Sequence, residues 1–130
     1  MKKQPDKQRA ESIIKSSLND IKFILKITPK EESASIIVRN IYESFRMLGE
    51  SILIKKGIKK INHINSINEL IKLNLNTKKP LNLLENLMRL RNNINYNGYR
   101  ANLFEAKDTI LLAKTCYLPL LNKVKKILEK

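Results

Sequence analysis

Apolar residues recur every three or four positions along most of this chain, which is the period of one face of an α-helix. Only three glycines and four prolines occur in 130 residues, so few positions interrupt that period. No segment shows the strict alternation of apolar and polar residues that indicates a half-buried strand. The sequence therefore predicts an all-α fold, a four- to five-helix up-and-down bundle with short loops.

The interruptions in the pattern predict where the first three helices begin and end. Helices are expected over about residues 7–26 and 33–56, because a proline preceded by threonine falls between them and disfavours helical geometry. Gly57 follows two lysines, as is typical of a helix C-terminus. Residues 58–65 are expected to connect to a short helix centred on residues 67–71. The second helix has apolar residues on several faces, so we expect it to be the central one.

Two further helices are expected in the C-terminal half. Pro80 can occupy the first turn of the fourth helix, whose apolar stripe ends near Ile94, before the Asn97-Gly98 turn signal. The fifth begins around Leu103. Pro119 lies inside its pattern and predicts a kink or a division, since proline removes a backbone donor.

The length suits one domain with its own core, so we expect a single helical domain over residues 1–130 with a flexible N-terminus at 1–6. The chain has one cysteine and one histidine, which excludes an internal disulfide and a Cys/His zinc site. No apolar stretch resembles a secretory signal or a membrane span. These features predict a cytoplasmic protein with no metal, no cofactor and no membrane contact. Neither a glycine-rich phosphate loop nor a Ser/His/Asp pattern indicates another class of enzyme.

Positive charge dominates the composition, with 26 Lys and Arg against 12 Asp and Glu and a formal net charge of +14. Such a surface attracts polyanions such as RNA by steering and counterion release. A composition rich in lysine, isoleucine and asparagine can also arise from genome bias and serve only solubility. The charge therefore indicates a class of partner without deciding it.

Arg91 is the cation that solubility explains least well. It follows Leu87 by four positions and Leu84 by seven, so it projects close to the apolar stripe of the fourth helix. Burying an uncompensated charge costs several kcal/mol, so Arg91 needs a partner. One interpretation is an ion pair with Glu43 or Glu50 on a neighbouring helix. The other is an anion-binding role.

The sequence around Arg91 resembles the signature of HEPN domains, which is an Arg, commonly followed by Asn, Asp or His, and then a His some four to six residues after the Arg. Arg91-Asn92 matches the start of this motif, and Tyr96 occupies the place of the His at the shortest spacing. The Asn97-Gly98-Tyr99 turn resembles that of archaeal-type members. Residues 41–46 and 53–58, followed by His63 before a short helix, resemble the family's second helix and the connection after it. The resemblance covers about residues 34–128.

The resemblance implies a helical homodimer in which two Arg motifs meet in a cleft, with part of the fourth helix near Arg91 at the dimer surface. Many members are metal-independent ribonucleases or partners of minimal nucleotidyltransferases. In such a ribonuclease, His exchanges protons with the RNA 2′-hydroxyl or the leaving oxygen, while Arg binds the phosphate charge. A tyrosine phenol, with an ordinary pKa of about 10, is a poor base near neutrality. We therefore expect ribonuclease activity to be weak or lost, with Arg91 and Tyr96 as the catalytic candidates if it survives. His63 is expected to be a packed or capping residue away from Arg91.

The predicted nucleic-acid-binding residues share one end of the fourth helix: Arg89, Arg91, Asn92, Asn95, Tyr96, Tyr99 and Arg100. Arginines can bind phosphates, amides can form hydrogen bonds, and tyrosine rings can stack on bases or simply pack. For Asn95 and Asn97, helix caps or turns are the better interpretation.

Two functions remain open. The chain is a HEPN-like protein that binds RNA or nucleotides, or it is an interaction module for a nucleotidyltransferase or another toxin-antitoxin or defence component. A homodimer is expected because the second helix has apolar residues on more faces than one small bundle can cover, and exposed apolar patches usually mark interfaces.

Overall fold

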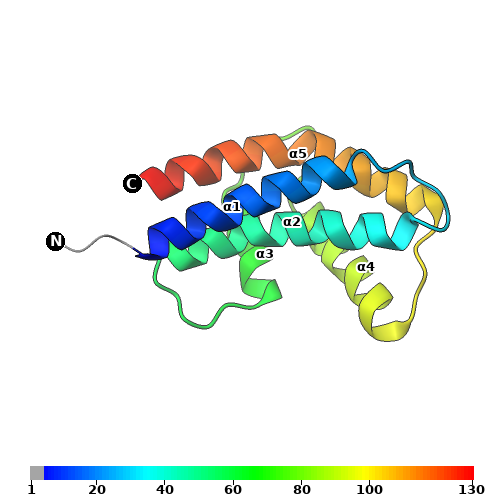
Figure 1. Ribbon diagram of the computed structural model, residues 1–130, viewed down its shortest axis with the longest axis horizontal. Helices are drawn as coiled ribbons and strands as arrows, with labels where there is room; N and C mark the ends of the chain where they lie inside the picture. The colour runs from blue at the N-terminus through cyan, green and yellow to red at the C-terminus, as the bar shows by residue number, and fades with distance from the viewer. Residues whose placement is uncertain (1–4) are drawn as a thin grey trace.

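The computed structural model describes residues 5–130, and this part of the chain contains five α-helices and no strand (Figure 1). The all-α bundle predicted from the sequence is confirmed. The helices are α1 (Pro5–Ile24), α2 (Ala34–Lys55), α3 (His63–Lys72), α4 (Leu83–Asn97) and α5 (Leu103–Glu129). The predicted flexible N-terminus lies largely outside the described residues, since α1 already includes residues 5 and 6.

Helix α2 is the centre of the bundle, as its several apolar faces predicted. It packs against each of the other four helices, and its side chains from Ala34 to Leu48 include a continuous series with no exposed surface. Helix α1 runs antiparallel to α2, whereas α5 runs in the same direction as α2 (Figure 1). The shorter helices α3 and α4 lie on the opposite side of α2 and incline away from its axis (Figure 1). The two sides of α2 are thus covered by different helices.

Two helix boundaries differ from where the sequence pattern placed them. Helix α3 begins at His63, within the expected connection, because the Asn62 side chain accepts a hydrogen bond from the Asn65 N–H (2.8 Å). Helix α4 begins at Leu83 and not at Pro80. Pro80 instead lies in a preceding turn, closed by the Leu83 N–H donating to its carbonyl (3.1 Å). The Asn62 cap thus makes His63 the first residue of α3.

The sequence predicted a helix end at Gly57 and a kink or a division of the last helix at Pro119. Gly57 follows α2 with a left-handed φ of 78°, as predicted for a C-terminal glycine. Of the two outcomes expected at Pro119, a kink or a division, the division does not occur, because α5 continues through this residue. Pro119 itself is exposed.

A buried hydrogen-bonded chain joins the three long helices. The Ser17 hydroxyl on α1 donates to the Ser44 carbonyl on α2 (2.6 Å) and lies 2.6 Å from the Tyr117 hydroxyl on α5. Burial raises the pKa of Tyr117 to about 12, so its hydroxyl stays protonated. The Tyr117 ring also packs edge-on against Phe45. Polar and aromatic contacts therefore fix α1, α2 and α5 together. Within the part of the chain described, no helix is both long and apolar enough to cross a membrane.

Helices α2 and α3 lie in close contact at Gly49. A Cβ atom placed on Gly49 would lie only 1.8 Å from the backbone oxygen of Ser66. Ser66 is a fully buried residue. Neither a side-chain rotation nor a small shift of that backbone can relieve such an overlap. The missing side chain of Gly49 therefore sets how near α3, and with it His63, lies to α2.

We predict that Gly49→Ala destabilises the protein by about 1–3 kcal/mol in urea unfolding, because overpacking at this crossing outweighs the better helix propensity of alanine. Ser16→Ala, which changes an exposed position of α1, serves as the control. A variant at Gly49 as stable as the parent chain would contradict the close crossing.

Candidate functional site

Side chains from three helices meet around the guanidinium of Arg91. Its Cζ lies 5.1 Å from the ring centre of Tyr42 on α2 and 5.6 Å from that of Tyr96 on α4. One terminal nitrogen donates to the Asn92 side-chain oxygen (2.8 Å), and the other lies 3.5 Å from Nε2 of His63 on α3. We call Tyr42, His63, Arg91, Asn92 and Tyr96 the Arg91 cluster.

The cluster is layered from the core to the surface. Tyr42 is fully buried, His63, Arg91 and Asn92 are half-buried, and Tyr96 is 69% exposed. The Tyr42 and His63 rings are 6.0 Å apart at a tilt of 37°. The guanidinium therefore lies between an inner aromatic ring and an outer one, an arrangement that stabilises a cation over the ring faces.

The ion pair between Arg91 and Glu43 or Glu50 that one interpretation of the sequence required is absent. Both carboxylates instead bind Arg46 on the same helix, at 2.9 Å from Nε for Glu43 and 2.9 Å from a terminal nitrogen for Glu50. The two carboxylates neutralise Arg46, and its hydrogen bonds to Glu43 hold the pKa of that carboxyl below its usual range. Among the described residues, no carboxylate forms an ion pair with Arg91. Arg91 therefore has aromatic and amide neighbours in place of a carboxylate counter-ion.

His63 lies against Arg91, so the expectation that it lies elsewhere is wrong. The cause is the Asn62 cap, which makes His63 the first residue of α3, together with the close crossing of α2 and α3. Burial lowers the pKa of His63, and the positive charges of Arg91 and Arg46 lower it further against the opposing effect of Glu43 and Glu50. The imidazole is therefore neutral at pH 7.

The contact with Arg91 bears on the tautomer of His63. Arginine can only donate, so a hydrogen bond across this 3.5 Å contact requires the tautomer with the lone pair on Nε2 and the ring proton on Nδ1. Nδ1 is buried and has no hydrogen-bond partner among the described residues, and the same holds for the Tyr42 hydroxyl. Burial raises the pKa of Tyr42 to about 12. The only side chain of this cluster that can accept a proton near neutrality is thus His63.

Three of the seven predicted binding residues belong to the cluster, namely Arg91, Asn92 and Tyr96. Arg89 is not among the cluster's contacts and donates to Asn86 (2.9 Å), and the Tyr99 hydroxyl donates to Glu105 at the start of α5 (2.9 Å). Asn95 and Arg100 are exposed near the same end of α4. Asn97 donates to Asn93 (2.9 Å), and Gly98 ends the helix with a φ of 70°, as the turn signal predicted.

Sequence reasoning missed the two cluster residues that come from other helices, Tyr42 and His63. An asparagine before an amphipathic run could have marked His63 as the first residue of a helix. No local signal could have shown that this helix end lies beside Arg91, 28 positions away along the chain.

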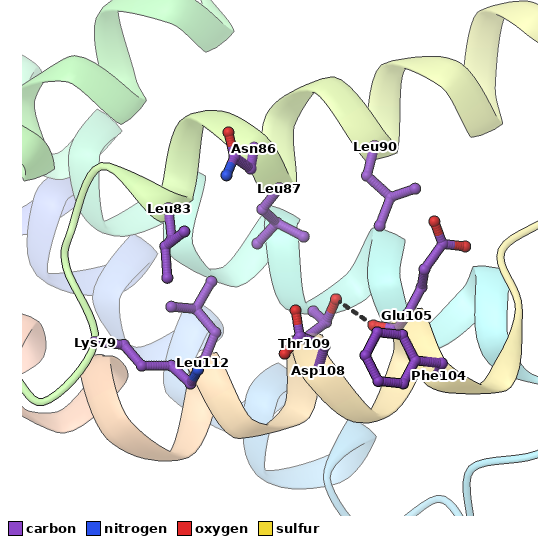
Figure 2. Close-up of a pocket in the computed structure, with 10 residues that line it drawn as sticks. All are labelled: Lys79, Leu83, Asn86, Leu87, Leu90, Phe104, Glu105, Asp108, Thr109 and Leu112. Carbon is purple, nitrogen blue, oxygen red and sulfur yellow. Dashed lines mark hydrogen bonds between the residues drawn. The ribbon is translucent and has the colours of Figure 1, made fainter.

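A separate hollow of about 260 Å³ lies between α4 and α5 (Figure 2). Leucines from both helices form much of its wall, and Lys79, Glu105 and Asp108 add charges. Figure 2 shows Thr109 on the α5 side of this hollow, where its hydroxyl donates to the Glu105 carbonyl (2.8 Å). Two carboxylates against one lysine disfavour a phosphate here, so we place the candidate anion site at Arg91.

No family profile, characterised protein or solved structure matches this chain. Within residues 5–130, no three side chains of His, Cys, Asp or Glu are grouped so that they could hold a metal ion. Any assignment of function therefore depends on the geometry of the Arg91 cluster itself.

We predict that stability falls as the pH drops below about 6.5, the pKa of an imidazole in an unfolded chain. The folded-state pKa of His63 lies lower, so in this range the unfolded state binds more protons and is favoured as the pH falls. Urea unfolding at pH 7.5, 6.5 and 5.5 measures the effect. Because His63 is the only histidine, His63→Gln should flatten this dependence. An unchanged slope in that variant would show that other groups cause it.

Proposed function

We propose that this chain is a HEPN-like helical protein that binds single-stranded RNA at the Arg91 cluster. The observation that supports this most directly is the guanidinium of Arg91, which has no carboxylate partner among the described residues and lies against an exposed aromatic ring. An arginine near the apolar face of its own helix, without a structural counter-ion, is well placed to bind a phosphate.

The surroundings of Arg91 favour RNA over a simple inorganic anion. Tyr96 is 69% exposed, so the ring face that does not contact the guanidinium can stack on an unpaired base. Bases are available for such stacking in single strands and not within a duplex. The net charge of +14 would add a general attraction that weakens as salt rises.

In this proposal, cleavage by the motif position itself is weak or lost. Tyr96 stands where the HEPN signature has its histidine, and a phenol does not accept a proton readily near neutrality. The protein would then bind RNA with little or no cleavage by the motif residues.

The second candidate is a protein-interaction module that pairs with a nucleotidyltransferase or another toxin-antitoxin or defence component. The hollow between α4 and α5 favours it, because leucine walls and two carboxylates suit an apolar side chain next to a basic one better than a nucleic acid. RNA binding by the isolated protein, without a partner, distinguishes the two candidates.

We predict that the purified protein binds a fluorescent single-stranded RNA, measured by anisotropy, and that Arg91→Ala weakens this binding about 10- to 100-fold. That loss corresponds to one charged hydrogen-bonding contact of about 1.5–3 kcal/mol. Tyr96→Ala should cost about 1–3 kcal/mol if a base stacks on the ring. Lys22→Ala removes an exposed cation of α1 and is the control for diffuse charge. Equal losses at Arg91 and Lys22 would show that no specific site exists.

A homodimer is the other part of the proposal, and an exposed apolar stripe on α5 supports it. Phe104, Leu111 and Leu118 follow one another at intervals of seven residues and are 76%, 48% and 59% exposed. This spacing places them on one side of the helix, as in the seam of paired helices.

We predict a dimer by light scattering at tens of micromolar and a monomer for Leu111→Lys, because a charge within the stripe opposes its burial. Lys114→Ala, one turn further along α5, is the control. A monomeric parent chain would exclude the dimer, and a dimeric Leu111→Lys would place the interface elsewhere.

A further inference from the structure

We infer that an RNA strand bound at Arg91 continues over the connection between α2 and α3, where Lys59 and Lys60 bind its neighbouring phosphates. The inference rests on the proposed binding of RNA at the Arg91 cluster and extends that site along the surface. Residues 56–62 form the connection, and Figure 1 shows it as a loop on the side of α2 where α3 and α4 also lie. It ends at His63, which contacts Arg91.

Lys60 lies close to the Arg91 cluster along the chain. Three peptide bonds separate it from His63, so their Cα atoms are at most about 11 Å apart. The Asn65 side chain on α3 donates to the Lys60 carbonyl (3.4 Å), which holds the end of the connection against the first turn of α3. Lys59 and Lys60 are both exposed. A phosphate next to the one at Arg91 would therefore lie within reach of these long side chains.

The other two lysines at this end of α2 have structural explanations that Lys59 and Lys60 lack. Lys55 lies in the last turn of α2, where a cation stabilises the negative end of the helix dipole. Lys56 pairs with Glu69 (2.7 Å). Lys59 and Lys60 lie beyond the helix, and neither forms an ion pair among the described residues. The stability of α2 and α3 therefore does not account for these two charges.

The carboxylates near Lys59 do not neutralise it. A hollow of about 490 Å³ beside the start of α1 is lined by Lys59 and Arg9 together with Asp6 and Glu50. Glu50 is already bound by Arg46 at 2.9 Å. Two cations thus lie near one carboxylate that has no ion pair among residues 5–130, and this part of the surface stays net positive.

Exposed apolar side chains accompany these lysines, which favours a nucleic acid over a purely solvating role. Ile58 on the connection is 43% exposed, and Ile64, the second residue of α3, is 58% exposed. A lysine that serves only solubility needs no such neighbour, whereas nucleobases present flat apolar faces that such side chains can cover. With the exposed ring of Tyr96, the surface combines cations with apolar contacts, as proteins that bind single strands do.

The test compares two ligands, a single-stranded RNA of about 16 nucleotides, at the upper end of common site sizes, and a dinucleotide with one phosphate. Anisotropy measures the labelled RNA, and the dinucleotide is measured by competition. Lys59→Ala/Lys60→Ala should weaken RNA binding about 10- to 30-fold at about 0.1 M salt, and the slope of log affinity against log salt should shrink by about 1.4, because each phosphate contact to a single strand contributes about 0.7. Binding of the dinucleotide, which occupies Arg91 alone, should change less than about twofold.

Three further variants complete the set. Lys22→Ala/Lys26→Ala removes two exposed cations at the opposite end of the bundle, where α1 ends, and lowers the net charge equally, so it measures the diffuse attraction. Lys59→Arg/Lys60→Arg keeps both charges and should bind like the parent chain, which separates a lost contact from a disturbed loop. Arg91→Ala should weaken binding of the RNA and of the dinucleotide alike.

The outcomes distinguish this inference from the function it rests on. Equal RNA affinities for Lys59→Ala/Lys60→Ala and Lys22→Ala/Lys26→Ala overturn the path over the connection and leave binding at Arg91 standing. A dinucleotide that loses as much affinity as the RNA also overturns the path, because the lysines would then act on the Arg91 site itself. Unchanged binding in Arg91→Ala, or absence of RNA binding in every form, overturns the proposed function.

Discussion

The close packing of α3 on α2 at Gly49 is the constraint on which the candidate site depends. Because no side chain separates Gly49 from the Ser66 backbone, α3 lies near enough for its first residue to contact a side chain of α4. Helix α2 supplies the shared surface for both shorter helices, and its Tyr42 ring forms the floor beneath Arg91. A core packing requirement thus determines the geometry of a surface cluster.

The sequence of α2 also determines which of two arginines is paired with carboxylates. Arg46 and Arg91 both act on Tyr42 and His63 by their charge, but the acids of α2 lie three residues before and four after Arg46 on its own helix. Neighbours at these spacings meet without any loop or tertiary contact, so Arg46 takes both carboxylates. Arg91, on a different helix, has a side-chain amide and two aromatic rings instead. One arginine is therefore structural, while the other keeps an available charge.

Sequence periodicity was sufficient for the helices and insufficient for the site. The apolar spacing predicted five helices and a central α2, because burial of a stripe is a property of each segment by itself. It failed at Pro80, where a turn precedes the helix. Arg91, Asn92 and Tyr96 were found because they lie within one short segment. His63 was misplaced because its distance from Arg91 depends on how two helices cross α2, which no local pattern encodes.

The bond between Ser17 and Tyr117 has a consequence for how the chain is made. These residues are 100 positions apart, yet their hydroxyls meet inside the core, and the Ser17 hydroxyl also holds the Ser44 carbonyl of α2. During synthesis, α1 and α2 can pair as a hairpin early. Until α5 has left the ribosome, however, the Ser17 hydroxyl lacks Tyr117 as its second partner, and the side of α2 that α5 covers stays exposed. The Arg91 side of α2 is complete before that, since α3 and α4 precede α5 in the chain. The newly made chain would therefore assemble its Arg91 cluster while the rest of its core is still open to water.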